Sequence, residues 1–272
     1  IEKADKTGYL VNIRLVNYWI NAGGGYMNCN DHIITNNKYV EMDKDFNVTH
    51  EKTFEVSFQD KRYMGIEDIR IFPDDKTPGK LVFSGTSQHE DGKIGMLYGD
   101  YDVEAEHLIP TEVTPGFCES WCEKNWVYFH YKGENHMIYK WNPIQIGKIN
   151  KETHKLDLVE TKGEMPYIFQ HVRGSSPGFH YKDEYWFSLH IVSYETPRHY
   201  YHIIAVFDEN MNFKRHTAPF KYQEECIEYT LGLIVEDDRV IMSYSAWDRS
   251  SKISVYDKSY IDGLLKYDGK RN

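Results

Sequence analysis

The stretch "YMGIEDIRIF", residues 63–72, is the part of the sequence that decides the fold. Gly65 is followed by two adjacent carboxylates, Glu67 and Asp68, then by Arg70 and an apolar run. Charges at the start of an apolar strand do not help that strand to fold, which suggests that they face a functional surface. The same plan, a polar or charged opening followed by an apolar strand, recurs along the chain.

The repeat predicts a propeller. Five segments each have a polar opening, an apolar strand, a turn, a second strand ending in small or polar residues, a third strand and an edge strand. The openings lie near residues 12–14, 67–68, 124–125, 173–174 and 228–229. Their spacing of roughly 50 residues is typical of four-stranded propeller blades. We therefore predict an all-β fold, one five-bladed β-propeller domain over residues 1–272. The predicted blades lie near 8–60, 61–115, 116–165, 166–222 and 223–265.

The repeat also predicts where the charges meet. In a propeller the innermost strand of each blade lines the central channel. Charged openings on these strands would converge on one axis. Arg14, Asp68, Lys124 and Arg173 would then reach one funnel from four different blades.

Composition excludes several classes of partner. The formal net charge is −10 and no basic run is present, so binding to nucleic acid or to an anionic membrane is not expected. An anion would need a local cluster of cations. No apolar run approaches the roughly 20 residues that span a membrane.

Cys118 and Cys122 are spaced like half a metal site, but no second pair completes it. We expect free thiols, no metal and a cytoplasmic location.

Several segments resemble, in order, the inverting β-mannoside phosphorylases, five-bladed propeller enzymes to which β-mannosyltransferases are related. "GIEDIRIF" (65–72) resembles their Gly-x-Glu-Asp-Pro-Arg motif, and "EKNWVYF" (123–129) their Lys-Asn-Trp segment. "MIYKWNP" (137–143) falls where they have a strand ending in a cation. The segments 172–192 and 229–248 resemble their Gly-rich turn before a His-ending strand and their last blade. Together these matches cover about residues 10–257.

The resemblance implies a site. Asp68 would be the catalytic acid that protonates the glycosidic oxygen, with inorganic phosphate as the nucleophile and no other cofactor. Phosphate would be held by a set of cations and polar groups: Arg14, Arg70, Lys124, Lys140, Arg173, His190 and Tyr201. Tyr200 is the alternative to Tyr201 as the channel residue. Asp248 would bind sugar hydroxyls. Trp141 and Trp247, at strand ends, are candidate platforms for a sugar ring.

Strand geometry predicts different directions for the three charged side chains of the first motif. Neighbouring residues on a strand face opposite ways. If Asp68 points into the channel, Arg70 points the same way and would either hold the Asp68 carboxylate in place or bind phosphate. Glu67 would point away, as a structural partner. Ile69 stands where the family motif has proline. Arg173 and Lys140 exchange the family's lysine and arginine, so the anion bound could differ.

Because the sequence differs from the family motifs at these positions, other functions are also compatible with it. A glycosyltransferase on the same scaffold would hold the diphosphate of a sugar nucleotide, with Asp68 as base. A propeller that only binds carbohydrate or protein would need no catalytic acid. A hydrolase would need a second carboxylate opposite Asp68, for which Glu228 and Asp248 are candidates. The sequence does not specify the sugar, the linkage or the acceptor.

Overall fold

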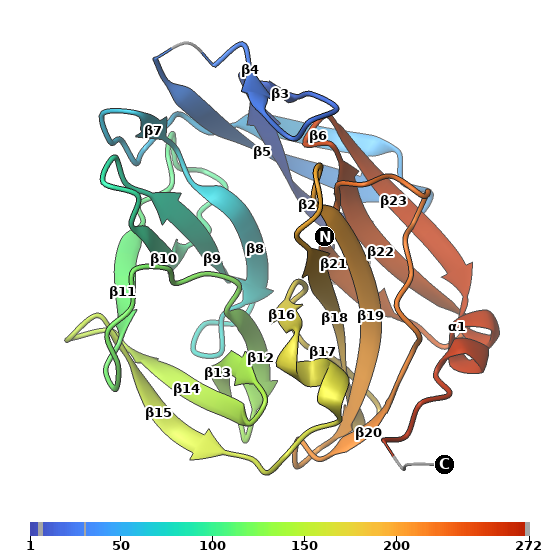
Figure 1. Cartoon of the computed structure of the whole chain (residues 1–272). Coiled ribbons are helices and arrows are strands. Elements are labelled where there is room, and N and C mark those ends of the chain that lie inside the picture. The colour runs from blue at the N-terminus through green and yellow to red at the C-terminus, as the bar shows by residue number, and fades with distance from the viewer. Residues whose placement is uncertain (5–7, 30, 270–272) are drawn as a thin grey trace.

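The structure is a computed structural model that describes residues 1–4, 8–29 and 31–269. It is almost entirely β, with sheets arranged around a common centre (Figure 1). This confirms the all-β prediction. Among the described residues, no helix is long and apolar enough to cross a membrane.

The first sheet has the order β1-β2-β5-β6, and β7 pairs with β5. Its strands are β1 (Glu2–Ala4), β2 (Gly8–Val16), β5 (Ile33–Asp43), β6 (Val48–Thr53) and β7 (Tyr63–Met64). A small hairpin of β3 (Trp19–Ile20) and β4 (Tyr26–Met27) rises between β2 and β5. Within the described residues, β1 pairs with Gly8–Leu10 alone, and no strand pairs with that edge of β2 beyond Leu10.

The second sheet has eight strands and is nearly closed. One antiparallel half contains β8 (Glu67–Pro73), β9 (Leu81–Gln88), β10 (Ile94–Asp100) and β11 (Thr111–Pro115). The other contains β12 (Val127–Tyr131), β13 (Glu134–Trp141), β14 (Ile144–Asn150) and β15 (Lys155–Thr161). A short parallel pairing of β11 with β15 joins the halves. The end strands meet again, because Phe72 of β8 stacks on Tyr128 of β12 with 5.7 Å between ring centroids.

The remaining chain forms two sheets. A short 3₁₀ helix (Tyr167–Gln170) leads into β16 (Val172–Gly174), β17 (Phe179–Tyr181), β18 (Glu184–Ser193), β19 (His199–Asp208) and β20 (Phe213–His216). The last sheet contains β21 (Glu228–Val235), β22 (Arg239–Ala246) and β23 (Ser250–Asp257), followed by α1 (Lys258–Leu264).

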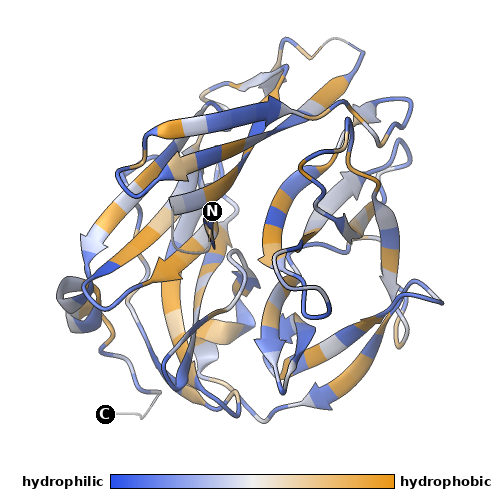
Figure 2. Cartoon of the chain, turned by 180° about the vertical axis from the view of Figure 1, so that it is seen from behind, coloured by the Kyte–Doolittle hydropathy of each residue, from blue (hydrophilic) through white to orange (hydrophobic). Residues whose placement is uncertain are grey.

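Apolar residues hold neighbouring sheets together. Hydrophobic and hydrophilic residues alternate along many strands, as expected where side chains point to alternate faces (Figure 2). One core cluster, which includes Phe129 and Phe187, packs β12–β14 against β18 and β19. Another, which includes Trp186 and Val240, packs β18 and β19 against β21, β22 and α1. The first and last sheets share a much smaller buried cluster of Tyr9, Ile234 and Ile241.

Gly65 fixes the approach to β8. Its φ is +93°, and a Cβ there would lie 1.9 Å from the carbonyl oxygen of Thr35 on β5. Only glycine fits this close approach without moving the backbone. The turn that precedes Glu67 and Asp68 is thereby held against the first sheet.

Candidate active site

Asp68 lies at an irregular point of β8. Its φ is +52°, and the pairing of β8 with β9 shifts register between Glu67 and Arg70. This bulge breaks the strict alternation of side chains. As a result Glu67 and Asp68 line the same cavity, and the expectation that Glu67 points away is wrong.

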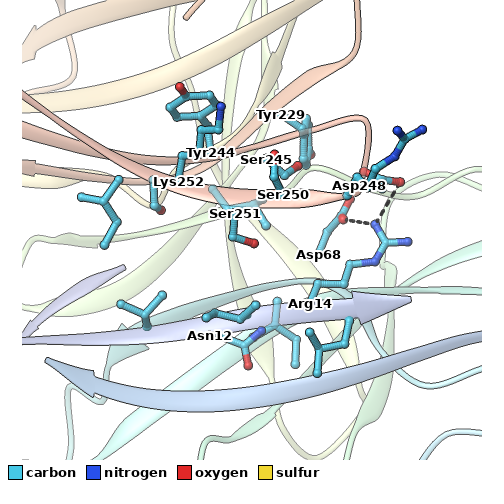
Figure 3. A pocket seen from close by; sticks show the side chains of 18 of the residues that line it. Asn12, Arg14, Asp68, Tyr229, Tyr244, Ser245, Asp248, Ser250, Ser251 and Lys252 are labelled. Atoms are coloured by element: carbon cyan, nitrogen blue, oxygen red, sulfur yellow. Dashed lines mark hydrogen bonds and ion pairs between the residues drawn. The ribbon is translucent and has the colours of Figure 1, made fainter. Parts of the chain in front are cut away.

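Arg14, from β2, is surrounded by carboxylates. Its Nη1 lies 2.9 Å from Asp68 Oδ1 and 3.9 Å from Asp248 Oδ2, and its Nη2 lies 3.5 Å from Glu67 Oε1. Figure 3 shows Arg14 reaching Asp68 and Asp248. Tyr18 accepts from Arg14 Nη2 at 2.8 Å and donates to Asp248 at 2.8 Å. The two terminal nitrogens of Arg14 are therefore occupied by protein groups.

Arg70 is buried and donates hydrogen bonds to three separate parts of the chain. It is 1% exposed. Its guanidinium donates to the carbonyl oxygens of Ser175 at 2.7 Å and Asp68 at 3.0 Å, and to Tyr229 Oη at 2.9 Å. Asn125 Oδ1 lies 3.5 Å away. Of the two predicted roles, support of Asp68 and phosphate binding, these contacts favour the first, because buried donors already satisfied by protein are not available to a ligand. Arg70 thus fixes the backbone of Asp68.

A cavity of about 560 Å³, which we call the site cavity, opens in front of these residues. Its lining includes Arg14 with the three carboxylates around it, Glu67, Asp68 and Asp248. It also includes three further cations (Lys124, Arg173 and Arg198), a fourth carboxylate (Glu195) and several polar or aromatic residues (Asn125, His190, Tyr200 and Tyr229). The structure thus brings together Arg14, Asp68, Lys124, Arg173, His190 and Asp248, all of them named from the sequence.

His190 is neutral at physiological pH. It is 2% exposed, and burial, with the nearby charges of Arg173, Arg70 and Lys124, holds its pKa well below the usual value. Its Nδ1 lies 2.8 Å from Ser175 Oγ. When Ser175 donates to Nδ1, Nε2 carries the ring proton and can donate to an anion.

Four other residues predicted for the site lie elsewhere. Lys140 is exposed on β13 beside the ring of Tyr139. Tyr201 lies near Lys221, and Tyr200, the alternative, lines the site cavity instead. Trp141 is 4% exposed and packs on Phe187, so no sugar ring can stack on it.

Trp247, the fourth, is half-buried. Its Nε1 donates to Glu225 at 2.7 Å, and its ring packs on the cluster that contains Tyr18 and Ile33. Within the described residues, the site cavity is not lined by Trp247. Trp141 is therefore corrected to a packing role, whereas Trp247 lies outside the site cavity and its role as a sugar platform stays a prediction.

Glu228 is also structural. It is fully buried and accepts the backbone N–H groups of Tyr222 at 2.6 Å, Gln223 at 2.9 Å and Glu225 at 2.9 Å. These bonds fold the loop that leads into β21. Of the two carboxylates considered as a hydrolytic base, only Asp248 borders the site cavity.

We expect Glu228→Gln to destabilise the protein by about 2 kcal/mol, because the amide places a donor against backbone donors. Chemical denaturation at neutral pH measures the change. Glu224→Gln, on the exposed part of the same loop, is the control and should be near neutral. Unchanged stability of Glu228→Gln would contradict this anchoring role.

The environment of Glu67 in the folded protein disfavours its ionised form. Burial, together with Asp68 and Asp248, raises its pKa above the usual 4.5 despite the opposing charges of Arg14 and Lys124. A raised pKa in the folded state means that folding favours the protonated carboxyl. The free energy of unfolding therefore falls as pH rises from 4.5 through the folded pKa.

We expect Glu67→Gln to remove this dependence and to raise the unfolding midpoint at pH 7. Thermal unfolding between pH 4.5 and pH 7 measures both effects. Glu55→Gln, outside the site, should leave the pH dependence unchanged. A midpoint of Glu67→Gln that falls at pH 7 would show instead that the carboxylate's attraction to Arg14 dominates.

Arg198, Tyr18, Asn125 and Tyr229 are among the residues of the site that were not predicted one by one from the sequence. Arg198 follows Pro197 in the turn between β18 and β19, and a cation in the turn after the His190 strand was the available signal. Asn125 and Tyr229 lie in two of the polar openings, near 124–125 and 228–229, and that position was their signal. Tyr18 gave no signal, because a tyrosine in a tyrosine-rich chain is common.

Comparisons with known proteins support this fold. Neither a family model nor a curated protein matches the sequence. Among solved structures, β-1,2-mannobiose phosphorylase from Listeria innocua, in complex with β-1,2-mannobiose, has a TM-score of 0.62 at 15% identity. The match covers 97% of this chain and 86% of that one. The chain therefore shares the fold of this phosphorylase.

Two further structures are similar. MPT-4, a mannose phosphorylase from Leishmania mexicana in complex with phosphate ion, has a TM-score of 0.53 at 12% identity, covering 95% of this chain and 90% of that one. The other is a structure from the GH130 family of mannoside phosphorylases. That family contains glycoside hydrolases that target β-1,2-mannosidic linkages in Candida mannan. This structure has a TM-score of 0.55 at 12% identity, covering 94% and 82%. The resemblance expected from the motifs is confirmed as a shared fold.

Proposed function

We propose that this protein is an inverting glycoside phosphorylase that acts on a β-mannoside-type linkage. One observation carries the proposal: a carboxylate that could act as the acid and several cations line the same cavity. Asp68, Lys124, Arg173 and Arg198 all border the site cavity. A neutral glycan needs no such set of cations, whereas phosphate does.

We also propose that the sheets are the five blades of one propeller. The eight-stranded sheet divides into two four-stranded meanders at the parallel β11–β15 pairing. These two meanders, together with the first, third and last sheets, make five units, which is the number predicted from the repeat. The centre of such a propeller is where Arg14, Asp68, Arg173 and Asp248 meet, each from a different unit.

In the proposed reaction Asp68 gives its proton to the glycosidic oxygen as the bond from that oxygen to the anomeric carbon breaks. A phosphate oxygen attacks the anomeric carbon from the opposite face and forms the new bond. The products are a sugar 1-phosphate of inverted configuration and the free acceptor. Asp68 regains a proton from solvent before the next cycle.

The other residues position these groups. Arg14 forms ion pairs with Glu67, Asp68 and Asp248, and its positive charge offsets the repulsion among these three carboxylates. Arg70 holds the carbonyl of Asp68 and so the direction of its side chain. Lys124, Arg173 and Arg198 offset the charge of phosphate, and His190 adds a neutral donor.

Hydrolysis is the second candidate. Glu67 and Asp248 line the same cavity as Asp68, so carboxylates that could activate water are present. Water would then replace phosphate, and turnover would not depend on phosphate.

Thermal shift and product analysis together separate these functions. We expect phosphate alone to raise the unfolding temperature, and β-1,2-mannobiose with phosphate to release mannose 1-phosphate. Release of free mannose at equal rates with and without phosphate would favour the hydrolase. Stabilisation by a nucleoside diphosphate but not by phosphate would favour a sugar-nucleotide transferase. No turnover of any β-mannoside would refute the proposal.

A further inference from the structure

A second cavity, of about 540 Å³, lies between the first and last sheets. We call it the seam cavity. Its floor is Val11–Val16 of β2, and its roof is formed by β22, β23 and the turn between them, from Ser243 to Ile253 (Figure 3). Where other neighbouring sheets are joined by large aromatic clusters, this junction has a hollow.

The hollow has two local causes. Among the residues that the structure describes, β1 covers only Gly8–Leu10, and this edge of β2 pairs with no strand beyond Leu10. Across the gap the last sheet presents small residues, Ser243, Ser245 and Ser251. Serine side chains are too short to fill the space that Phe129 and Phe187 fill at another junction.

The lining of the seam cavity is mainly apolar. It includes Val11, Ile13, Leu15, Met42, Phe46 and Leu231. The site cavity, by contrast, is lined mainly by charged and polar groups. The two cavities therefore suit two different parts of one ligand.

The two cavities lie next to each other at the catalytic cluster. Arg14, Asp68, Tyr229 and Asp248 line both of them. In addition, Arg14 Nε is buried there and has no hydrogen-bond partner among the described residues. A ligand that lies across this cluster can be in contact with Asp68 and with both cavities.

Inversion requires this kind of arrangement. The nucleophile and the leaving group lie on opposite sides of the anomeric carbon, and the acid lies beside the leaving oxygen. The cations place phosphate in the site cavity. The leaving group then departs from Asp68 on the other side, where the seam cavity begins.

We propose that the seam cavity binds the leaving group of the substrate, and that this group is an apolar, alkyl-type aglycone. The inference rests on the proposed function and narrows its substrate class. The substrate would be an amphiphilic β-glycoside, with its sugar at Asp68 and its hydrocarbon part between β2 and β23. A cavity of this volume is in the range of small-ligand sites.

The test compares octyl β-mannoside with methyl β-mannoside by isothermal titration calorimetry, with the octyl glycoside kept below its micelle concentration. We expect the octyl glycoside to bind at least about tenfold more tightly, because each buried methylene adds affinity. Ser251→Trp fills the cavity, and Leu15→Asp places a charge in it. Both should abolish the preference and leave the affinity for the methyl glycoside unchanged.

The matched control is Val255→Trp, on the same strand as Ser251 but outside the lining, which should keep the preference. Circular dichroism checks that each variant is folded. Equal affinities for the two glycosides in the unmodified protein, or a preference that survives in either cavity variant, would overturn the inference. A preference for the octyl glycoside without any phosphate-dependent product would support the cavity assignment and refute the phosphorylase reaction.

Discussion

Asp68→Asn should lower kcat for phosphorolysis about 1,000-fold, the size expected when a general acid is lost. The amide is close in size to the carboxyl and can still accept from Arg14, so the site should keep its shape. It cannot donate the proton that the leaving oxygen needs. Initial rates with β-1,2-mannobiose and saturating phosphate measure the effect.

Two controls make this result specific. Asp183→Asn, at an exposed turn before β18, should leave the rate unchanged. Asp68→Asn should still be stabilised by phosphate, because the cations are intact. A variant that retains more than a tenth of the activity would show that Asp68 is not the acid, and Glu67, with its raised pKa, would be the next candidate.

Arg173→Ala should raise KM for phosphate about 100-fold, which corresponds to about 2.7 kcal/mol of lost binding. The guanidinium lines the site cavity and lies over the ring of Tyr194, which holds it in place. A charge-assisted hydrogen bond to phosphate is worth an energy of this order. Initial rates over a range of phosphate concentrations measure the change.

Lys140→Ala is the matched control, because Lys140 was expected to bind phosphate and lies outside the site cavity. It should leave KM for phosphate unchanged. If Lys140→Ala impairs phosphate use and Arg173→Ala does not, the anion site has been placed wrongly.

Much of this arrangement could be predicted from sequence. Regular alternation of apolar residues indicates strands reliably, and the repeated polar openings indicated which strands meet. Arg14, Asp68, Lys124 and Arg173 were expected to converge from separate parts of the chain, and they line one cavity. Long-range convergence was predictable because it follows from the repeat.

Local irregularities were not predictable. The bulge at Glu67–Arg70 turned Glu67 into the site and left Arg70 buried. A second register shift, between Ile138 and Lys140, accompanies the exposure of Lys140. Neighbouring strand residues point to opposite faces, and Tyr200 rather than Tyr201 lines the site cavity although their strand pairs regularly. The composition of a strand does not show where such shifts occur.

The seam cavity was also invisible to sequence analysis. It depends on how far β1 extends along β2 and on the small residues that face it from the last sheet. Serines on a strand are unremarkable until the structure shows what they face.

The most direct test of the central claim is nuclear magnetic resonance of the phosphorolysis product. The protein is incubated with β-1,2-mannobiose and phosphate, and phosphorus and proton spectra are recorded as the reaction proceeds. The account predicts α-mannose 1-phosphate as the first product, formed only when phosphate and Asp68 are both present. Formation of the β-anomer, or of free mannose independently of phosphate, would contradict it.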